Sequence, residues 1–409
     1  MNSNKFHESY TPPEYILSKY ADILVNFALH GGKGLQLGES VGLRIMQPAL
    51  PLLPHLQQAI VKAGGHMYLN FVPQYGFDKQ FYTYANNEQL KHHYSGIAHA
   101  ILEAIDHEMV IYSPSDLKEL QNIDIQKINL RSSTNPYFKE RSKLFDEGKL
   151  GYTLAYYPTD SMAQEAGMTL EEYWQQVINA CYLDEENPVK SWKNTFTMIH
   201  ETRDKLTDLK IQYLHIKGAD VDLKVKIGSD RKWLGGTGRN IPSYETFVSP
   251  DWRGTQGRAL FSEPLYTKGT LISGIKLEFK DGIVINATAE QGQEVLLQLL
   301  QEENFNKIGE FSLTDKRISR IDRFMAETLF DENRGGEFGN FHIALGDAYK
   351  DSLNRDQDHS PTNQDFEQRG FNTSLLHSDI VSTTDRRVVA ILENGEEKVI
   401  YEKGQFTLD

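Results

Sequence analysis

Three consecutive stretches decide the fold of the N-terminal half: SVGLRIMQ (40–47), LPLLPHLQQAIVKAGG (50–65) and HMYLNFV (66–72). The first and third are apolar runs of strand length. The second carries apolar residues at helical spacing and ends at a glycine pair. Strand, helix and strand within about 30 residues are typical of a parallel βαβ unit. We therefore expect an α/β fold with parallel βαβ units in this half of the chain.

The alternation of strands and helices continues outward from these stretches and then gives way to strands. We expect helices at 14–29, 86–105, 168–184 and 188–209, and strands at 109–113 and 151–158. After about residue 205, strand-like runs dominate at 211–218, 221–228, 270–289 and 308–313, with one helix at 290–303 and a polar loop at 350–370. Asp281-Gly282 predicts a hairpin inside the third run. We expect an N-terminal α/β domain at 1–205 and a β-rich α+β domain at 206–409.

The composition excludes several classes of protein. The 409 residues include 43 Lys and Arg against 57 Asp and Glu, which gives a formal net charge of −14. An acidic chain argues against nucleic acid and anionic membranes as partners. The single cysteine, Cys181, excludes an internal disulfide or a Cys-rich metal site, and its apolar helical context predicts a buried thiol. The N-terminal residues contain no apolar stretch of secretory length, so we expect a soluble, cytoplasmic protein.

Metal-ligating residue types in apolar surroundings are concentrated in the C-terminal half. They are Glu245 in NIPSYETF (240–247), Glu310 in IGEFSL (308–313), His342 and Tyr349 in FHIALGDAY (341–349), and His377 and Asp379 in LLHSDI (375–380). A carboxylate buried in a strand costs several kcal/mol unless a partner compensates. His377 and Asp379, two residues apart, would project from one face of a strand. Together these residue types predict a site for two divalent cations.

Simpler interpretations exist for each residue taken alone. A single Glu in a strand often faces water, and a His in an apolar run is more often a hydrogen-bonded core residue than a ligand. His92, His93 and His99 also fall in one helical pattern, where a solvated helix face is favoured over a metal site. The combination in one domain, rather than any single residue, indicates a metal centre.

The segments WLGG, NIPSYETF, IGEFSL, TLFDEN, HIALGDAY and NTSLLHSD resemble the bacterial aminopeptidase S/T family, the thermophilic-type dinuclear metallo-aminopeptidases. The resemblance implies removal of N-terminal residues from peptides with a free N-terminus, and a homodimer. It also implies two divalent ions per chain, Zn, Co or Mn, that activate a water. The implied metal ligands are Glu245, Glu310, His342, Tyr349, His377 and Asp379, and the implied catalytic residues are Glu245, Glu310 and Tyr349, with Glu310 as our choice of bridging ligand.

Two departures from the family pattern bear on activity. Tyr244 stands where many members have a second acid, and RGGEFGNF (334–341) is longer than the family's spacer before His342. The insertion could reshape the pocket or displace that ligand. Two rival interpretations therefore stay open: another dinuclear hydrolase, such as an amidohydrolase or phosphoesterase, and a catalytically inactive metal- or peptide-binding relative.

Overall fold

The computed structural model describes residues 8–267, 270–354 and 361–408, and these form two compact units. Unit 1 comprises 8–193 and 237–242, and unit 2 comprises 194–236 and 243–408. The boundary falls inside the long helix α10 (Pro188–Asp208) rather than at its end. The expectation of domains at 1–205 and 206–409 stays a prediction.

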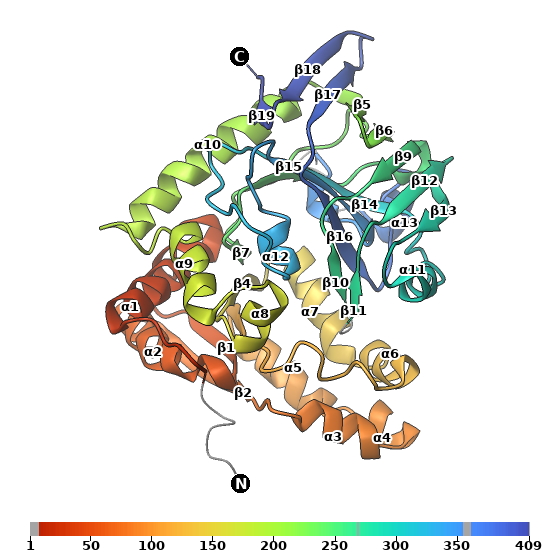
Figure 1. The fold of residues 1–409 in the computed structure, drawn as a ribbon. Coiled ribbons are helices and arrows are strands. Elements are labelled where there is room, and N and C mark those ends of the chain that lie inside the picture. Colours follow the sequence, from red (N-terminus) through yellow and green to blue (C-terminus); the bar gives the residue numbers. More distant parts are fainter. Residues whose placement is uncertain (1–7, 268–269, 355–360, 409) are drawn as a thin grey trace. The chain divides into compact units, whose positions relative to one another are not determined.

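Unit 1 is built on a parallel sheet with the strand order β2-β1-β3-β4-β7 (Figure 1). Its strands are β1 (Ser40–Met46), β2 (His66–Val72), β3 (His107–Tyr112), β4 (Gly151–Tyr156) and β7 (Asn240–Ile241). Every neighbouring pair is parallel, and the register sets Val41 of β1 beside His107 of β3. The βαβ unit expected at 40–72 is therefore confirmed.

The helices of unit 1 follow the expected pattern only in part. The helix expected at 86–105 is two helices, α4 and α5, because the backbone at His92 is extended, with ψ 122°. Helices α3, α6, α7 and α8 were not expected. The buried apolar stripe of α6 and α7 is weak, and the Asp124 and Asn135 side chains cap their N-termini. The helices are α1 (Glu14–Ile23), α2 (Leu53–Lys62), α3 (Phe77–Tyr84), α4 (Asn87–Lys91), α5 (Ser95–Ala104), α6 (Ile125–Ser133), α7 (Pro136–Asp146), α8 (Asp160–Glu165) and α9 (Leu170–Ala180).

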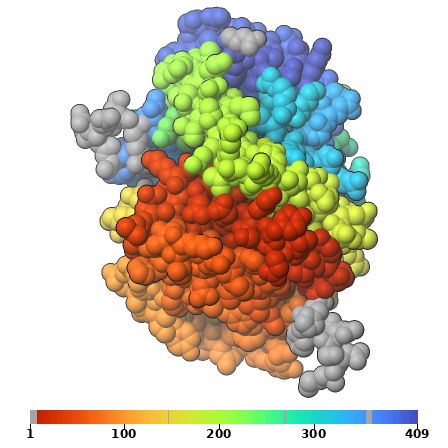
Figure 2. All heavy atoms as spheres, turned by 90° about the vertical axis from the view of Figure 1, so that its left-hand side faces the viewer, coloured from red at the N-terminus to blue at the C-terminus, as the bar shows by residue number. Residues whose placement is uncertain are grey.

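The segment that follows α1 bends sharply. A π-helical turn (Leu24–Ala28) and a 3-10 turn (Leu29–Gly31) continue the helix, and His30 adopts a left-handed backbone conformation. In the space-filling view, the N-terminal segments of unit 1, coloured red to orange, form one continuous surface (Figure 2). Among the described residues, no helix is both long and apolar enough to cross a membrane.

Unit 2 contains an antiparallel sheet of eight strands in the order β13-β12-β9-β6-β5-β17-β18-β19. The expected hairpin is present: β12 and β13 meet at Asp281 and Gly282, both with positive φ, as a tight two-residue turn requires. The strands are β5 (Ile211–Gly218), β6 (Val221–Lys226), β9 (Gln256–Leu260), β12 (Lys276–Lys280), β13 (Ile283–Thr288), β17 (Arg386–Leu392), β18 (Glu397–Glu402) and β19 (Gln405–Phe406).

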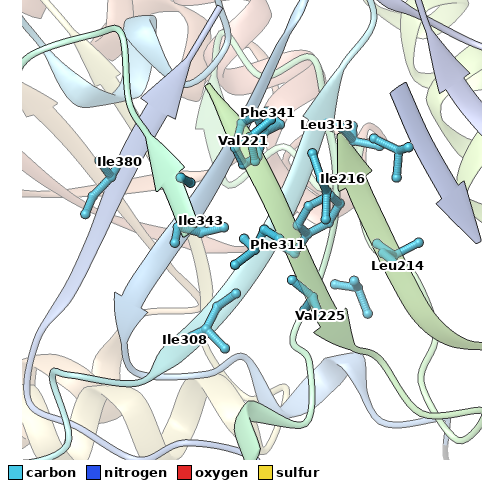
Figure 3. Packing of buried hydrophobic residues seen from close by; sticks show 14 of the residues in the cluster. Leu214, Ile216, Val221, Val225, Ile308, Phe311, Leu313, Phe341, Ile343 and Ile380 are labelled. Carbon is cyan, nitrogen blue, oxygen red and sulfur yellow. The ribbon is translucent and has the colours of Figure 1, made fainter. Parts of the chain in front are cut away.

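A second antiparallel sheet of unit 2 has the order β16-β15-β14-β8. Its strands are β8 (Glu245–Val248), β14 (Ile308–Thr314), β15 (Asn340–Gly346) and β16 (His377–Ser382). Alternate residues of these strands, including Phe311, Phe341 and Ile380, pack against Leu214, Ile216 and Val225 of the larger sheet (Figure 3). One face of the smaller sheet is therefore committed to the hydrophobic core, and the other face is left for the polar residues.

Shorter elements complete unit 2. They are the β10 (Leu265–Thr267) and β11 (Thr270–Ile272) pair, α11 (Gln293–Leu299), α12 (Thr328–Asp331) and α13 (Asn363–Gln368). Helix α13 lies within the stretch expected to be a loop at 350–370, where a capping box between Thr362 and Asp365 starts the helix. Residues 355–360 of that stretch lie outside the described residues.

Candidate metal centre

Strand alternation places five of the six predicted ligands on one face of the smaller sheet. Glu245 lies on β8, Glu310 on β14, His342 on β15, and His377 and Asp379 on β16. Their immediate neighbours in the chain, such as Phe311 and Ile343, belong to the hydrophobic core on the opposite face. The alternation of side chains along each strand thus places the ligands on one face of the smaller sheet and the core residues on the other.

The strand register brings these residues together. Ala344 of β15 lies opposite both Glu310 and Asp379, so a small side chain stands between two carboxylates. Gly346 lies opposite His377, and a Cβ there would come within 2.0 Å of the Leu376 carbonyl oxygen. Small residues therefore stand opposite the longer side chains at the centre of the face, and at Gly346 the close approach of the backbone requires glycine.

The His342 imidazole lies at the centre of the cluster and is fully buried. Its Nε2 atom is 3.0 Å from Glu310 Oε1, 3.3 Å from Glu245 Oε2 and 3.9 Å from Asp379 Oδ1. The Ser312 hydroxyl, 3.3 Å from Glu245 Oε2, holds that carboxylate from the neighbouring strand. Three acidic groups therefore share one imidazole nitrogen, which is more negative charge than one imidazole can balance.

Glu310 connects the two histidines of the cluster. Its Oε1 atom faces His342 at 3.0 Å, and its Oε2 atom faces His377 Nε2 at 3.9 Å. Asp379 Oδ1 also stands between the two imidazoles, 3.3 Å from His377 Nε2. The other ring nitrogen of His377, Nδ1, is 2.9 Å from the Asp347 carbonyl oxygen, which fixes the ring with Nε2 toward the carboxylates.

The ionisation of these groups reflects their burial and mutual repulsion. Burial, together with the charges of Glu245 and Asp379, raises the pKa of Glu310 to about 7. Burial opposes the charge on His377, but the adjacent Asp379 and Glu310 carboxylates raise its pKa to about 10. Burial likewise opposes ionisation of Asp379, yet the two imidazoles lower its pKa below the usual range. The groups that hold protons are therefore ones that could bind cations instead.

Tyr349 lies at the open side of the cluster. Its ring is 5.1 Å from the ring of His377, edge on, and 5.6 Å from the ring of Phe247. Its backbone N–H donates to the Ser249 hydroxyl, and 36% of the residue is exposed. The six predicted residues are thus one cluster, with Tyr349 at the rim and the other five inside.

Glu332 joins the cluster although the sequence analysis did not assign it a role. It follows α12 and is almost completely buried, and its carboxylate lies within ligand distance of His342 and Asp379. Burial and the charges of Asp379 and Glu245 raise its pKa well above the usual range. The sequence signal that could have identified Glu332 is the acidic segment TLFDEN, a few residues before His342, because acids in an apolar run need a compensating partner.

The two departures from the family pattern leave the cluster intact. The Asn340 amide, at the end of the insertion, donates to the Glu332 and Arg334 carbonyl oxygens and ties the loop to the start of β15. The Tyr244 backbone N–H donates to the Asn333 side chain, and its own side chain is buried. The insertion therefore leaves His342 at its place in the strand register.

The donor set fits divalent cations. The buried Asp379 Oδ1 accepts no well-aligned hydrogen bond from the described residues. An unsatisfied buried carboxylate oxygen is costly unless a cation or proton satisfies it. Two groups that could each hold an ion, Glu245–Glu310–His342 and Glu332–His342–Asp379, overlap at His342. Imidazole and carboxylate together suit Zn, Co or Mn.

The family model described as thermophilic metalloprotease (M29) matches residues 14–406 of this chain. The chain belongs to that family. This membership confirms the resemblance drawn from the motifs, and it makes the protein a metal-dependent hydrolase of peptide bonds.

Individual relatives agree with this assignment. Aminopeptidase T of Thermus thermophilus is 29% identical over 335 residues, which cover 77% of this chain and 79% of that protein. Aminopeptidase 2 of Geobacillus stearothermophilus is 24% identical and covers 96% of this chain and 98% of its own length. The solved structure of wild-type AmpT from Thermus thermophilus superposes with a TM-score of 0.82 at 23% identity, covering 96% and 99% of the two chains. The superposition confirms the expected two-part α/β fold.

Proposed function

We propose that this chain is a metallo-aminopeptidase that removes N-terminal residues from peptides with water activated between two divalent ions. The proposed ligands are the residues that converge on the smaller sheet of unit 2: Glu245, Glu310, Glu332, His342, His377 and Asp379. Tyr349, at the rim, is proposed as a hydrogen-bond donor to the substrate rather than as an inner ligand. Zn, Co and Mn are the candidate metals, because each accepts this mixture of imidazole and carboxylate.

The observation that supports two ions best is the orientation of Glu310. Its two oxygens face two different imidazoles, at 3.0 and 3.9 Å, as expected for a carboxylate that bridges two cations. The charge count agrees. Four ionised carboxylates, Glu245, Glu310, Glu332 and Asp379, give 4 × −1, and two divalent ions give 2 × +2. Buried charges are tolerated when they are paired in this way.

Bound ions of this kind polarise the scissile carbonyl and lower the pKa of water. The chain must supply the rest of the chemistry. A carboxylate has to carry a proton from water to the leaving amine. Of the two candidates from the sequence, Glu245 and Glu310, we favour Glu245, because both oxygens of a bridging Glu310 would be occupied by the ions. Tyr349, exposed beside His377, is placed to donate its phenol proton to the oxygen that gains negative charge.

The relatives named aminopeptidase support action at the N-terminal end of the peptide. The acidic cluster provides a physical reason. A free α-amine is a cation that the surplus carboxylates would attract, whereas a blocked N-terminus offers no such charge. Peptides with a free N-terminus are therefore the proposed substrates.

We also propose a cytoplasmic homodimer. The resemblance to the family supports the dimer, and so does the edge strand β2, where the apolar side chains of Tyr68, Leu69 and Phe71 are exposed. Sedimentation velocity on the full chain tests it: a single species of monomer mass would contradict the dimer.

A substrate panel tests the proposed activity. Aminoacyl anilides, their N-acetylated counterparts and a phosphomonoester are offered to protein loaded with Zn, Co or Mn, with a chelator as control. We expect cleavage only of the free-amine anilides, lost with chelator. Preferred cleavage of the phosphoester would favour the phosphoesterase. Full metal loading without any turnover would favour the inactive relative.

A further inference from the structure

A second group of metal-ligating side chains lies within unit 1. His30 comes from the 3-10 turn Leu29–Gly31, Glu39 immediately precedes β1, and His107 is the first residue of β3. Because β1 and β3 are parallel neighbours, Glu39 and His107 meet at the amino ends of their strands. The turn after α1 brings His30 to the same corner.

The three side chains approach closely enough to share one ion. His30 Nε2 is 2.8 Å from Glu39 Oε1, and His107 Nε2 is 3.0 Å from Glu39 Oε2. The two imidazole rings lie edge to face, with centroids 4.5 Å apart, and one ligand atom from each residue falls within 4.8 Å of the others. Ligand atoms around a tetrahedral zinc, at about 2.0–2.1 Å from the metal, are separated by similar distances.

The backbone around the group holds these positions. His30 has φ 52° and ψ 33°, a left-handed conformation that costs free energy for a residue with a Cβ. Gly151, opposite His107 across the sheet, lacks the Cβ that would come within 2.1 Å of His107 Nδ1. The His107 ring is therefore confined, with Nε2 toward Glu39.

We propose that His30, Glu39 and His107 bind one divalent ion of the zinc class, at a site formed entirely by unit 1. Two imidazoles and one carboxylate are ligands that zinc accepts, and a water can complete the coordination on the exposed side. Access is available, since the side chain of His30 is 38% exposed and that of Glu39 is 21% exposed. This inference does not depend on the proposed peptidase chemistry. Its consequence is a cross-link between the turn after α1 and the start of β3.

The protonation of the group suits a cation. Burial, only partly offset by Glu39, lowers the pKa of His107, so the imidazole is neutral near pH 7, as a metal ligand must be. Burial opposes the charge on Glu39, but the Gln36 N–H and the two imidazoles lower its pKa and keep it ionised.

The hydrogen bonding of the His107 ring predicts a modest zinc affinity for this site. Its Nδ1 atom is buried and has no hydrogen-bond partner among the described residues. Most metal-binding histidines donate this second N–H to an acceptor, and the loss of such a bond typically costs about 10- to 100-fold in affinity. We therefore expect binding weaker by roughly that factor than at a zinc site with complete outer hydrogen bonding.

The test compares the zinc content of full-length variants by equilibrium dialysis and elemental analysis. Glu39→Gln keeps the shape of the side chain but removes its charge, and we expect it to bind one zinc per chain fewer than its parent. The loss should be the same in the wild-type background and in His342→Ala/His377→Ala, where the cluster of unit 2 is disabled. Peptidase activity of Glu39→Gln should stay at the parent level.

His55→Ala is the matched control. His55 forms an ion pair with Glu14 at 2.8 Å, and the described part of the chain offers no third ligand there, so its loss should not change the zinc count. Far-UV circular dichroism of Glu39→Gln confirms folding, and X-ray absorption of the zinc bound to His342→Ala/His377→Ala should show imidazole scattering. Equal zinc content in Glu39→Gln and its parent would overturn the proposal and leave the three residues as a hydrogen-bonded group. If the wild-type protein had no peptidase activity but Glu39→Gln still bound one zinc per chain fewer than its parent, only the proposed function would be rejected.

Discussion

The clusters in unit 2 and unit 1 combine the same side chains in different settings. In unit 2, three carboxylates and two histidines on neighbouring strands of one sheet converge with a fourth carboxylate, Glu332, which follows α12, and the group is largely buried. In unit 1, one carboxylate and two histidines meet from two connecting segments and a strand end, and they are partly open to solvent. The comparison shows that surplus buried negative charge, rather than the presence of His and Glu alone, separates a proposed two-ion catalytic centre from a proposed one-ion structural site.

Removing a ligand from unit 2 should have the largest effect. We expect His377→Ala and Glu310→Gln each to lower kcat/KM for an aminoacyl anilide by about 10³-fold or more, because each variant removes a proposed ligand of the ions that polarise the carbonyl and activate the water. A 10³-fold loss corresponds to about 4 kcal/mol of transition-state stabilisation. His215→Ala is the matched control, because His215 pairs with Asp222 at 2.7 Å on the larger sheet, outside the cluster. Wild-type turnover in both ligand variants would mean that the site is misassigned.

A substitution of Glu332 tests whether this residue binds the ions or only lies near them. We expect Glu332→Gln to lower metal affinity and activity by at least the roughly 10- to 100-fold that is typical of residues that only support a ligand, because the amide removes one of the four charges that compensate the ions. Glu337→Gln changes an exposed acid of the insertion and should have no effect. Metal affinity is measured by competition with a chromophoric chelator. Equal behaviour of the two variants would remove Glu332 from the centre.

The pH dependence of metal binding should differ between the units. In unit 2, Asp379 and Glu310 raise the pKa of His377 to about 10, so a metal must displace a proton throughout the neutral range. The affinity should therefore rise with pH, by about tenfold per unit for each proton displaced. In unit 1, the lowered pKa of His107 means that this residue has no proton to lose above pH 7. Zinc titrations at several pH values are made on His342→Ala/His377→Ala, which keeps the unit 1 site, and on Glu39→Gln, which keeps the unit 2 site. A flat profile for the unit 2 site would contradict the account.

Substitution of Cys181 should have the smallest effect on activity and metal content. The thiol is buried, but it belongs to none of the candidate metal-binding groups among the described residues. The thiol is fully buried, and desolvation raises its pKa well above the usual range. We expect no reaction with thiol reagents until the chain unfolds. Cys181→Ala should keep full activity and metal content and lose about 1 kcal/mol of stability. Rapid labelling of the native protein would show that this region opens.

Much of the fold could be predicted from local sequence patterns. The strands β1, β2 and β3 and the Asp281-Gly282 hairpin have strong periodicity or specific turn chemistry. Helices α6 and α7 were missed because their apolar stripe is weak and their starts depend on Asp124 and Asn135 caps. The break at His92 was missed because the pattern on both sides is helical.

The site was predictable where residues lie on strands and belong to recognisable motifs. His377 and Asp379 could be assigned to one face from their spacing alone, and the structure brings them together with the other predicted residues. The position of Glu332 depends on the path of a loop, which strand periodicity does not fix. The approach of His30 to His107 depends on a left-handed turn far away in the chain, for which the sequence carries no periodic signal.

Anomalous diffraction from crystals of the full chain grown with cobalt tests the central claim most directly. The account predicts two strong peaks on the polar face of the smaller sheet in unit 2, with Glu310 bound to both and each imidazole of His342 and His377 bound to one. A single peak there, or none, would contradict the two-ion centre.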